Sequence, residues 1–310
     1  MDRELLTWFN GRLVPDSEVR IHHTDSGLSF GHNVTDSART FGYRPFKLKE
    51  HIGRFYRSMS VARINPGMTP ERMEEIALEV LEANLPVLDP DGDVWVTQTA
   101  TGGRMRSTIG RFEFDRPGLL IATLPLGFAD YAHLYEKGAH AVTPSTRHIP
   151  PQSLDAKLKH RNRIFFTLAE FEVKEVDPEG FSLLLDIDGN VTENKGANFF
   201  IYRDGCLRTP TTRNCLEGVS RATVLELARE EGIPAVEEDF QPYHVTTAEE
   251  AFFCSTSYCM LPVTRYNGNV LGEGRPGPVY RQLIDAWSRR VGMDIPDQAL
   301  RGAATWSGGF

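Results

Sequence analysis

The chain has 310 residues, a formal net charge of -8, and 40% hydrophobic and 25% charged residues, which are ordinary globular proportions. Domains usually contain roughly 100–200 residues, so this length predicts two domains or one large α/β unit. The acidic balance argues against nucleic acids and anionic membranes as partners, because both require clustered Lys and Arg. Chemistry on small molecules is favoured instead.

The sequence contains no pattern typical of secretion, membrane insertion or metal binding. Charged residues follow Met1 without an apolar run, and no stretch approaches the roughly 18 apolar residues of a membrane span. We therefore expect a cytoplasmic protein. The four cysteines form no CxxC pair and have no histidine at ligand spacing, so we expect reduced, packed thiols and no metal. They are Cys206, Cys215, Cys254 and Cys259.

The first part of the chain predicts a small α+β domain over residues 1–124. Apolar residues at helical spacing predict two helices that cover a sheet, and Thr69 and Pro70 are suited to begin the second helix. The helices are expected near residues 52–59 and 73–81, and the strands over residues 7–15 (a hairpin turned at Asn10-Gly11), 94–99 and 118–124.

The second part predicts a larger α/β domain over residues 151–310, after a proline-containing interdomain linker over residues 125–150. Gly218 is expected to begin a helix that Gly232 ends. A helix is expected after Lys159, with an apolar face formed by Ile164, Phe165, Leu168, Ala169 and Val176. Hairpins are expected at Asp188-Gly189 and Asp204-Gly205, and a strand over residues 250–256.

Two kinds of ionisable residue in the second part are candidates for cofactor chemistry. Lys157 and Lys159 lie among arginines. This segment is either a solvated basic segment or the source of an amine that forms an imine. The second is possible because neighbouring cations favour the neutral form of a lysine amine. Spacing alone does not choose between them. Glu193 ends an expected strand, where it is either an exposed acid or an inward carboxylate that keeps a pyridine nitrogen protonated.

Three further segments carry groups suited to an anion. Arg54 shares a helical stripe with His51 and Ser58, which is either solvated or grips a phosphate. Gly218-Val219-Ser220 begins a helix, where backbone N–H groups and a hydroxyl attract anions, although an ordinary helix cap has the same sequence. Ser255-Thr256-Ser257 adds hydroxyl donors after a strand. The GxxxxGK[ST] pattern of a P-loop is absent.

Together these segments resemble the class IV (fold type IV) pyridoxal phosphate enzymes. That family includes branched-chain aminotransferases, D-amino acid aminotransferases, (R)-selective amine transaminases and aminodeoxychorismate lyase. The resemblance covers nearly the whole chain and is carried, in the family's order, by residues 25–31, 51–58, 159–163, 183–193 with Asn198, and 216–221 with Thr256. It implies a two-domain α/β fold with pyridoxal phosphate in a cleft, and it favours Lys159 over Lys157 as the Schiff-base lysine.

The resemblance also implies roles for other residues. Glu193 would contact the ring nitrogen, with Asn198 orienting the same region, and Leu216 would lie on the ring face. Arg147 would lie near the phenolic oxygen. The groups expected at the phosphate are those of Arg54, Val219, Ser220 and Thr256. Lys195 departs from the small residue that the family commonly has there.

The substrate residues are less well matched. Arg39 lies in a segment, residues 31–41, that resembles the branched-chain enzymes, as do residues 272–278. The Tyr-x-Arg of those enzymes is replaced by Trp95-Val96-Thr97, and their small-residue loop by Ser257-Tyr258-Cys259, which indicates a rebuilt carboxylate pocket. Arg104 and Arg106 fall where the D-amino acid and amine enzymes place a carboxylate-binding arginine, although exposed loop arginines are common.

The implied function is a ping-pong transaminase that moves an amino group through Lys159. The donor would be an amino acid, branched-chain or D-configured, or an (R)-amine, and the acceptor a 2-keto acid. The family also implies a homodimer with the active site at the subunit interface. Two alternatives remain open at this point: a lyase that releases pyruvate from aminodeoxychorismate, and a non-catalytic module that binds no cofactor.

Overall fold

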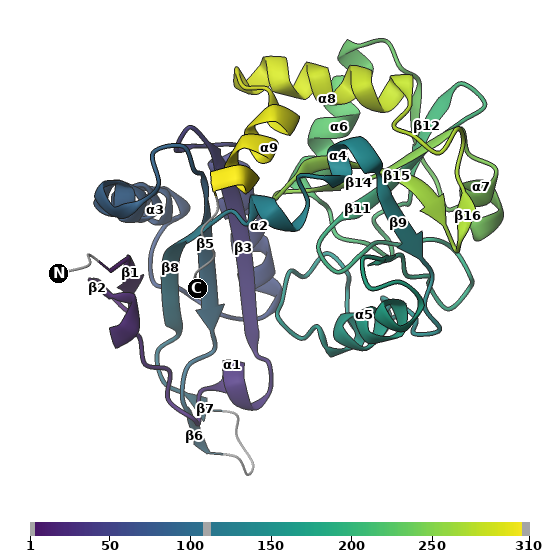
Figure 1. Ribbon diagram of the computed structural model, residues 1–310. Coiled ribbons are helices and arrows are strands. Elements are labelled where there is room, and N and C mark those ends of the chain that lie inside the picture. Colours follow the sequence, from purple (N-terminus) through teal and green to yellow (C-terminus); the bar gives the residue numbers. More distant parts are fainter. Residues whose placement is uncertain (1–3, 108–112, 306–310) are drawn as a thin grey trace. The chain divides into compact units, whose positions relative to one another are not determined.

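The computed structural model describes residues 4–107 and 113–305 (Figure 1). The chain divides into two compact units. The first unit contains the chain up to Leu126 together with Leu158–Asn162, and the second contains Gly127–Lys157 and the chain from Arg163 onward. These bounds differ from the expected organisation, because most of the segment expected as a linker belongs to the second unit and forms secondary structure there.

The first unit is built on an antiparallel sheet in the order β2-β1-β8-β5-β3-β4 (Figure 1). The expected hairpin is confirmed, with Asn10 and Gly11 both at positive φ in its turn. The strands are β1 (Leu6–Phe9), β2 (Arg12–Pro15), β3 (Asn33–Phe41), β4 (Arg44–Pro45), β5 (Val94–Thr101) and β8 (Gly118–Pro125). A separate ribbon pairs β6 (Met105–Ser107) with β7 (Glu113–Phe114), so the Arg106 segment is a strand and not only a loop.

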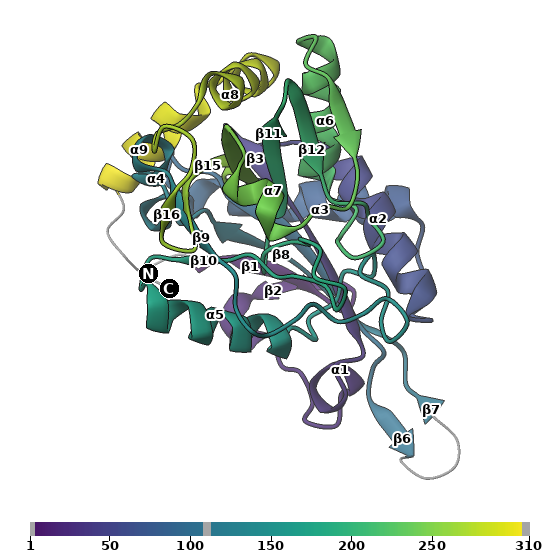
Figure 2. The same cartoon turned by 90° about the vertical axis from the view of Figure 1, so that its right-hand side faces the viewer.

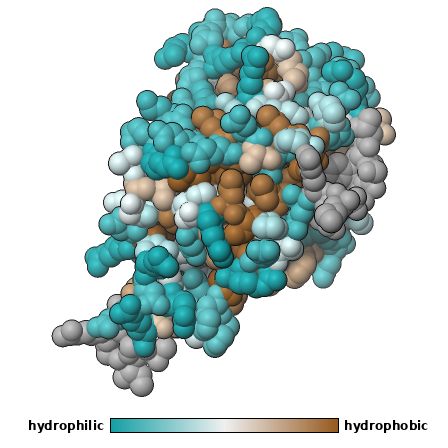
Figure 3. Space-filling view, turned by 90° about the vertical axis from the view of Figure 1, so that its left-hand side faces the viewer, coloured by the Kyte–Doolittle hydropathy of each residue, from teal (hydrophilic) through white to brown (hydrophobic). Residues whose placement is uncertain are grey.

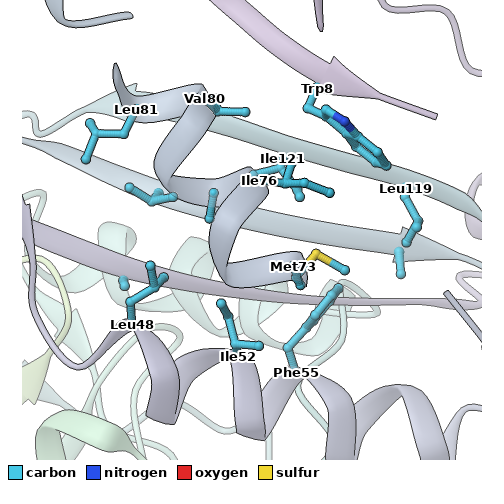
Figure 4. Close-up of a cluster of buried hydrophobic side chains, with 14 of the residues drawn as sticks. Trp8, Leu48, Ile52, Phe55, Met73, Ile76, Val80, Leu81, Leu119 and Ile121 are labelled. Carbon is cyan, nitrogen blue, oxygen red and sulfur yellow. The ribbon is translucent and has the colours of Figure 1, made fainter. Parts of the chain in front are cut away.

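Two helices, α2 (Leu48–Val61) and α3 (Pro70–Asn84), cover one face of this sheet. Thr69 caps α3 by accepting from the backbone N–H of Arg72, as its sequence predicts. Figure 4 shows Ile52 and Phe55 of α2 and Met73 and Ile76 of α3 pointing into one cluster with side chains of the sheet. The short helices of this unit are η1 (Asp16–Glu18), α1 (Ser26–Ser29) and η2 (Leu85–Val87).

The second unit is built on a mixed sheet in the order β10-β9-β15-β14-β11-β12-β13, with β16 beside β15 (Figure 2). The expected hairpin at Asp204-Gly205 joins β11 and β12. The strands are β9 (Ala139–Val142), β10 (Phe181–Ser182), β11 (Asn198–Arg203), β12 (Cys206–Thr209), β13 (Ala235–Glu237), β14 (Glu250–Ser255), β15 (Cys259–Tyr266) and β16 (Asn269–Val270). The turn at Asp188-Gly189 joins two extended segments that pair through an isolated bridge, Leu185 to Val191, and through backbone hydrogen bonds such as Thr192 N–H to the Leu184 carbonyl (2.9 Å).

The helices of the second unit are η3 (Phe128–Asp130), α4 (Leu134–Lys137), α5 (Ile164–Val176), α6 (Val219–Glu230), α7 (Pro242–Thr246), α8 (Pro278–Val291) and α9 (Ile295–Thr305). The expected apolar face of α5 is confirmed only in part. Ala169 is buried and Phe165 packs against the buried cluster, but Ile164, Leu168 and Val176 are exposed, and Phe166 and Val173 are buried instead. The reason is that α5 has apolar residues on most of its circumference, so its sequence does not define one inward face.

Several large apolar side chains remain exposed. In the first unit they include Leu13, Ile21, Leu28 and Phe30. Figure 3 shows one face of the molecule on which hydrophobic residues gather inside a border of hydrophilic ones. Within the described residues, no helix has the length and apolar character needed to cross a membrane.

Candidate functional site

Lys159 lies on a short segment that is fastened to β3 and α2 of the first unit. Its backbone N–H donates to Ser58 Oγ (3.2 Å), and its carbonyl accepts from the N–H of Thr35 (2.9 Å). Lys159 is partly buried there. Lys157, the alternative on spacing alone, belongs to the second unit and pairs with Asp155 (3.0 Å) as a half-exposed side chain.

Arg54 of α2 is held by a buried carboxylate, Asp36 of β3. The guanidinium donates twice, from Nε to Asp36 Oδ2 and from Nη2 to Oδ1, both at 2.8 Å. His51, one helical turn before Arg54, donates from Nδ1 to Asp36 Oδ1 (2.8 Å). His51, Arg54 and Ser58 are all at most 4% exposed, so the stripe that they form is a buried polar site and not a solvated one.

The charges around Asp36 set the protonation of this cluster. Burial by itself raises the pKa of Asp36, but the charge and hydrogen bonds of Arg54, with those of His51, outweigh it and hold the pKa well below its usual range. Burial lowers the pKa of His51, and the charges of Arg54 and Lys159 lower it further against the opposing effect of Asp36. The cluster is therefore a carboxylate, a guanidinium and a neutral imidazole, and Lys159 lies close enough to affect it.

Glu193 of the second unit is also an inward carboxylate, 7% exposed. Its Oε2 accepts from the backbone N–H of Leu216 (3.0 Å) and from Asn198 Nδ2 (3.3 Å), and its Oε1 faces His148 Nε2 (3.3 Å). Three nitrogen atoms from separate segments therefore surround this buried carboxyl group. Lys195, two residues on, is exposed, and its carbonyl accepts from Arg163 (2.8 Å).

The segment before α6 is fitted to Asn198. Asn198 Nδ2 also donates to the carbonyl of Leu216 (3.0 Å), and a Cβ at Gly218 would lie 2.0 Å from Asn198 Oδ1. Only glycine therefore fits at this position, immediately before the first turn of α6. Val219 and Ser220 begin that turn, each 8% exposed, and the first backbone N–H groups of a helix have no partner within the helix. This is an arrangement suited to an anion.

The remaining cofactor candidates of the second unit lie on loops. Thr256 follows β14, which pairs with β11 so that Cys254 is opposite Asn198. Thr256 is partly buried beside Ser255, whose Oγ accepts from the N–H groups of Ser257 and Tyr258. Arg147 is exposed, and its guanidinium donates to the carbonyls of Pro144 and Ser145, so it folds back on its own loop.

The substrate candidates Arg39, Trp95 and Thr97 share the face of the first sheet that the helices leave uncovered, because Arg39 is opposite Trp95 and Ser37 is opposite Thr97. Thr97 Oγ1 lies 2.9 Å from Ser37 Oγ. Arg39 is 3% exposed, lies 4.1 Å above the Phe41 ring, and has Nη2 3.9 Å from Asp93 Oδ2.

The other two arginines differ in their surroundings. Arg104 is exposed and lines a cavity of about 350 Å³ together with Thr99, Thr101 and Leu119. Arg106 is exposed and paired with Asp115. Of these two candidates, Arg104 is therefore the one that contributes to a cavity of the first unit.

Two residues of the site, Asp36 and His148, were given no role from the sequence. Asp36 had a detectable signal, because it alternates with Val34 and Ala38 on the core face of β3, where a charge requires a partner. His148 had no such signal, since its contact with Glu193 joins residues 45 positions apart in irregular segments.

A family model described as amino-transferase class IV matches residues 33–266. The chain belongs to this family. The aminotransferase is 30% identical to the Methanocaldococcus jannaschii protein named "Putative branched-chain-amino-acid aminotransferase". The match extends over 277 residues, which are 89% of this chain and 93% of the other. It is 26% identical over 284 residues, 91% of this chain and 96% of the other, to the D-alanine aminotransferase of Bacillus licheniformis.

Solved structures agree with the fold. The branched-chain amino acid aminotransferase from Thermobaculum terrenum, in its PLP-form (holo-form), is 25% identical and superposes with a TM-score of 0.82 over 98% of this chain and 98% of that one. The aminotransferase also spans 52% of the length of two Arabidopsis thaliana relatives named branched-chain-amino-acid aminotransferase-like proteins. The expected fold type IV class and aminotransferase family are confirmed.

We expect Asp36→Asn to destabilise this aminotransferase by roughly 3–5 kcal/mol, because it removes the carboxylate that pairs with the buried guanidinium of Arg54. The free energy of unfolding is measured by urea denaturation of the full chain. Asp115→Asn, which removes the partner of the exposed Arg106, is the matched control and should change the midpoint far less. Equal effects of the two changes would contradict the structural role of Asp36.

Proposed function

We propose that this aminotransferase binds pyridoxal 5'-phosphate and uses it to move an amino group from an α-amino acid to a 2-keto acid. The observation that carries the proposal is Glu193, a buried carboxylate that faces three nitrogen atoms, in a chain that also supplies a partly buried lysine, Lys159. A buried acid for a ring nitrogen and an amine for an aldehyde are the two groups that this cofactor requires.

The residues present fit the cofactor. Gly218 leaves space for close backbone approach where a Cβ would collide with Asn198, and the first turn of α6 adds N–H groups and the Ser220 hydroxyl. Lys159 would supply the covalent bond, Arg54 would contact the phosphate, and Glu193 would contact the ring nitrogen. The further contacts would come from Val219, Ser220 and Thr256 at the phosphate, Leu216 at the ring face, Asn198 beside Glu193, and Arg147 at the phenolic oxygen.

When bound, the cofactor supplies an electron sink that stabilises negative charge on the substrate Cα. The residues of the chain do the rest. Glu193 would hold the proton on the ring nitrogen, and Asn198 and the Leu216 N–H keep Glu193 in place. Lys159 Nζ would take up the proton from the substrate Cα as a general base and release it again as a general acid. In a ping-pong cycle, the same atom returns a proton to the second substrate.

Asp36 would give Arg54 a fixed direction before a phosphate arrives. Two hydrogen bonds from the guanidinium to Asp36 fix the plane of its planar, multi-donor head group. The neutral His51 fits this arrangement, since a second cation there would compete for Asp36. The cluster therefore anchors an anion on a buried, pre-oriented arginine.

The substrate carboxylate is best matched by Arg104. Arg39 is committed to Asp93, the Thr40 carbonyl (3.1 Å) and the Phe41 ring, whereas Arg104 lines a cavity on the sheet face that also carries Thr97 and Thr99. The names of relatives at 30% and 26% identity, a branched-chain and a D-alanine aminotransferase, also support an amino acid as donor.

We also propose that two copies form a homodimer and complete each other's sites. The exposed Ile21, Leu28 and Phe30 support this, because three large apolar side chains within ten residues are typical of a covered surface. One chain has a mass of 34.8 kDa, and analytical ultracentrifugation of the full chain should give twice that mass. A monomer at micromolar concentration would contradict the proposal.

Lys159→Ala should abolish the near-visible absorbance of the lysine-bound cofactor and all turnover, because no other amine takes its place. The matched control is Lys157→Ala, which removes a half-exposed lysine of the same segment and should keep both the absorbance and the activity. Absorbance that persists in Lys159→Ala and disappears in Lys157→Ala would assign the cofactor to the other lysine.

A coupled screen of L-amino acids, D-amino acids and (R)-amines against pyruvate and 2-oxoglutarate tests the reaction. We expect turnover with amino acids, and we expect Arg104→Ala to raise the KM for the keto acid roughly tenfold or more while changing kcat less, since one charge-assisted hydrogen-bonded contact is lost. Arg116→Ala, at another exposed arginine of the same cavity, is the control. Pyruvate release from aminodeoxychorismate without an acceptor would identify a lyase instead.

A further inference from the structure

His148 is a buried histidine with a defined position in the second unit. Its side chain is 5% exposed, and its backbone N–H donates to the carbonyl of Leu185 (2.9 Å). The rings of Phe165 and Phe166, at the start of α5, meet the imidazole edge-on at centroid distances of 5.3 and 5.6 Å. The ring is therefore fixed by contacts on its backbone and on its sides.

Both ring nitrogens of His148 face acceptors. Nδ1 lies 3.0 Å from the carbonyl oxygen of Ile149, and Nε2 lies 3.3 Å from Glu193 Oε1. A carbonyl oxygen and an ionised carboxylate can only accept, and a neutral imidazole has one N–H. Only the imidazolium form satisfies both contacts. The geometry thus identifies His148 and Glu193 as an ion pair.

The charges that face His148 agree with this assignment. Burial by itself lowers the pKa of His148, but the hydrogen bond and charge of Glu193, the Ile149 carbonyl and the charge of Asp186 outweigh it, so the pKa is raised above its ordinary value of 6.5. From α5 the ring meets two uncharged phenyl rings, and Arg163 lies beyond them, 5.8 Å from the Phe166 centroid.

The contacts of Glu193 show which of its oxygens faces a ligand. Oε2 already accepts two hydrogen bonds, from Asn198 and from Leu216. Oε1 accepts one, from His148. Because a carboxylate oxygen has two lone pairs, the remaining acceptor is on Oε1, the oxygen that His148 holds.

We propose that His148 is a positioning residue that orients Glu193 Oε1 toward the ring nitrogen of the cofactor and sets, through its positive charge, how strongly that carboxylate retains the ring proton. The inference rests on the proposed function. A cation beside a carboxylate weakens the attraction of that carboxylate for a proton on a neighbouring group. As the pH rises through the His148 midpoint, the imidazolium loses its proton, and Glu193 meets the ring nitrogen with its charge uncompensated.

The first test uses the protein without cofactor, so that it does not depend on the proposed function. Long-range 1H–15N NMR follows the titration of each histidine ring. We expect a His148 midpoint above about 6.5 in the wild type, and a lower one in Glu193→Gln, because the neutral amide no longer offsets burial. A His148 midpoint that is the same in both proteins would overturn the ion pair.

The second test uses the holoenzyme and two variants. His148→Gln keeps an N–H donor without a titrating charge, and His148→Arg keeps a charge over the whole range. We expect the kcat of the wild type to match that of His148→Arg at low pH and that of His148→Gln at high pH. The two kcat values should differ roughly tenfold if the charge changes the pKa of the ring nitrogen by one unit.

The outcomes separate the two hypotheses. An inflection that His148→Gln retains, or equal kcat values for the Gln and Arg variants at every pH, would overturn the role of His148. Near-ultraviolet circular dichroism of both variants shows whether they fold, and the Glu193→Gln titration tests the ion pair if they do not. An ion pair in a protein that shows no cofactor absorbance would instead refute the proposed function.

Discussion

A carboxylate removed from water requires donors, and this constraint shapes both units. Asp36 is fully buried on the core face of β3, and α2 meets it with an arginine and a histidine one turn apart. Glu193 is buried at the end of an irregular segment, and the loop before α6, β11 and the His148 segment each direct an N–H at it. Within each unit, elements distant in sequence thereby converge on one carboxylate, because an unpaired buried charge is strongly destabilising.

Much of the first unit follows from local sequence. The Asn10-Gly11 turn, the Thr69 cap and the helical spacing of Met73, Ile76 and Val80 each act within a few residues, and each is present in the structure. The family and its fold were also predictable, since the motif segments occur in the family's order and residues 33–266 match its model. These signals need no knowledge of tertiary contacts.

Long-range contacts account for what the sequence did not indicate. The inward face of α5 is set by Leu184 and by the surrounding unit, not by the helix itself. The segment after residue 126 contains prolines but also β9, which pairs with β15 more than 100 residues later. The contact between His148 and Glu193 is of the same kind. In contrast, Arg54 was proposed from its helix alone and is buried in the structure, while the identity of its partner depended on the register between β3 and α2.

Residues Leu158–Asn162 belong to the first unit, although the chain on either side belongs to the second. They complete the first unit through Thr35, Ser58 and Asn33, whose Oδ1 accepts from the N–H of Arg161 (3.0 Å). During synthesis, therefore, the first unit lacks these contacts until the ribosome has also produced Gly127–Lys157 of the second. A protein cut at residue 126 would lose its lysine, and of two separately expressed halves the first would lack Leu158–Asn162, which the second would carry without the strand and helix that hold them.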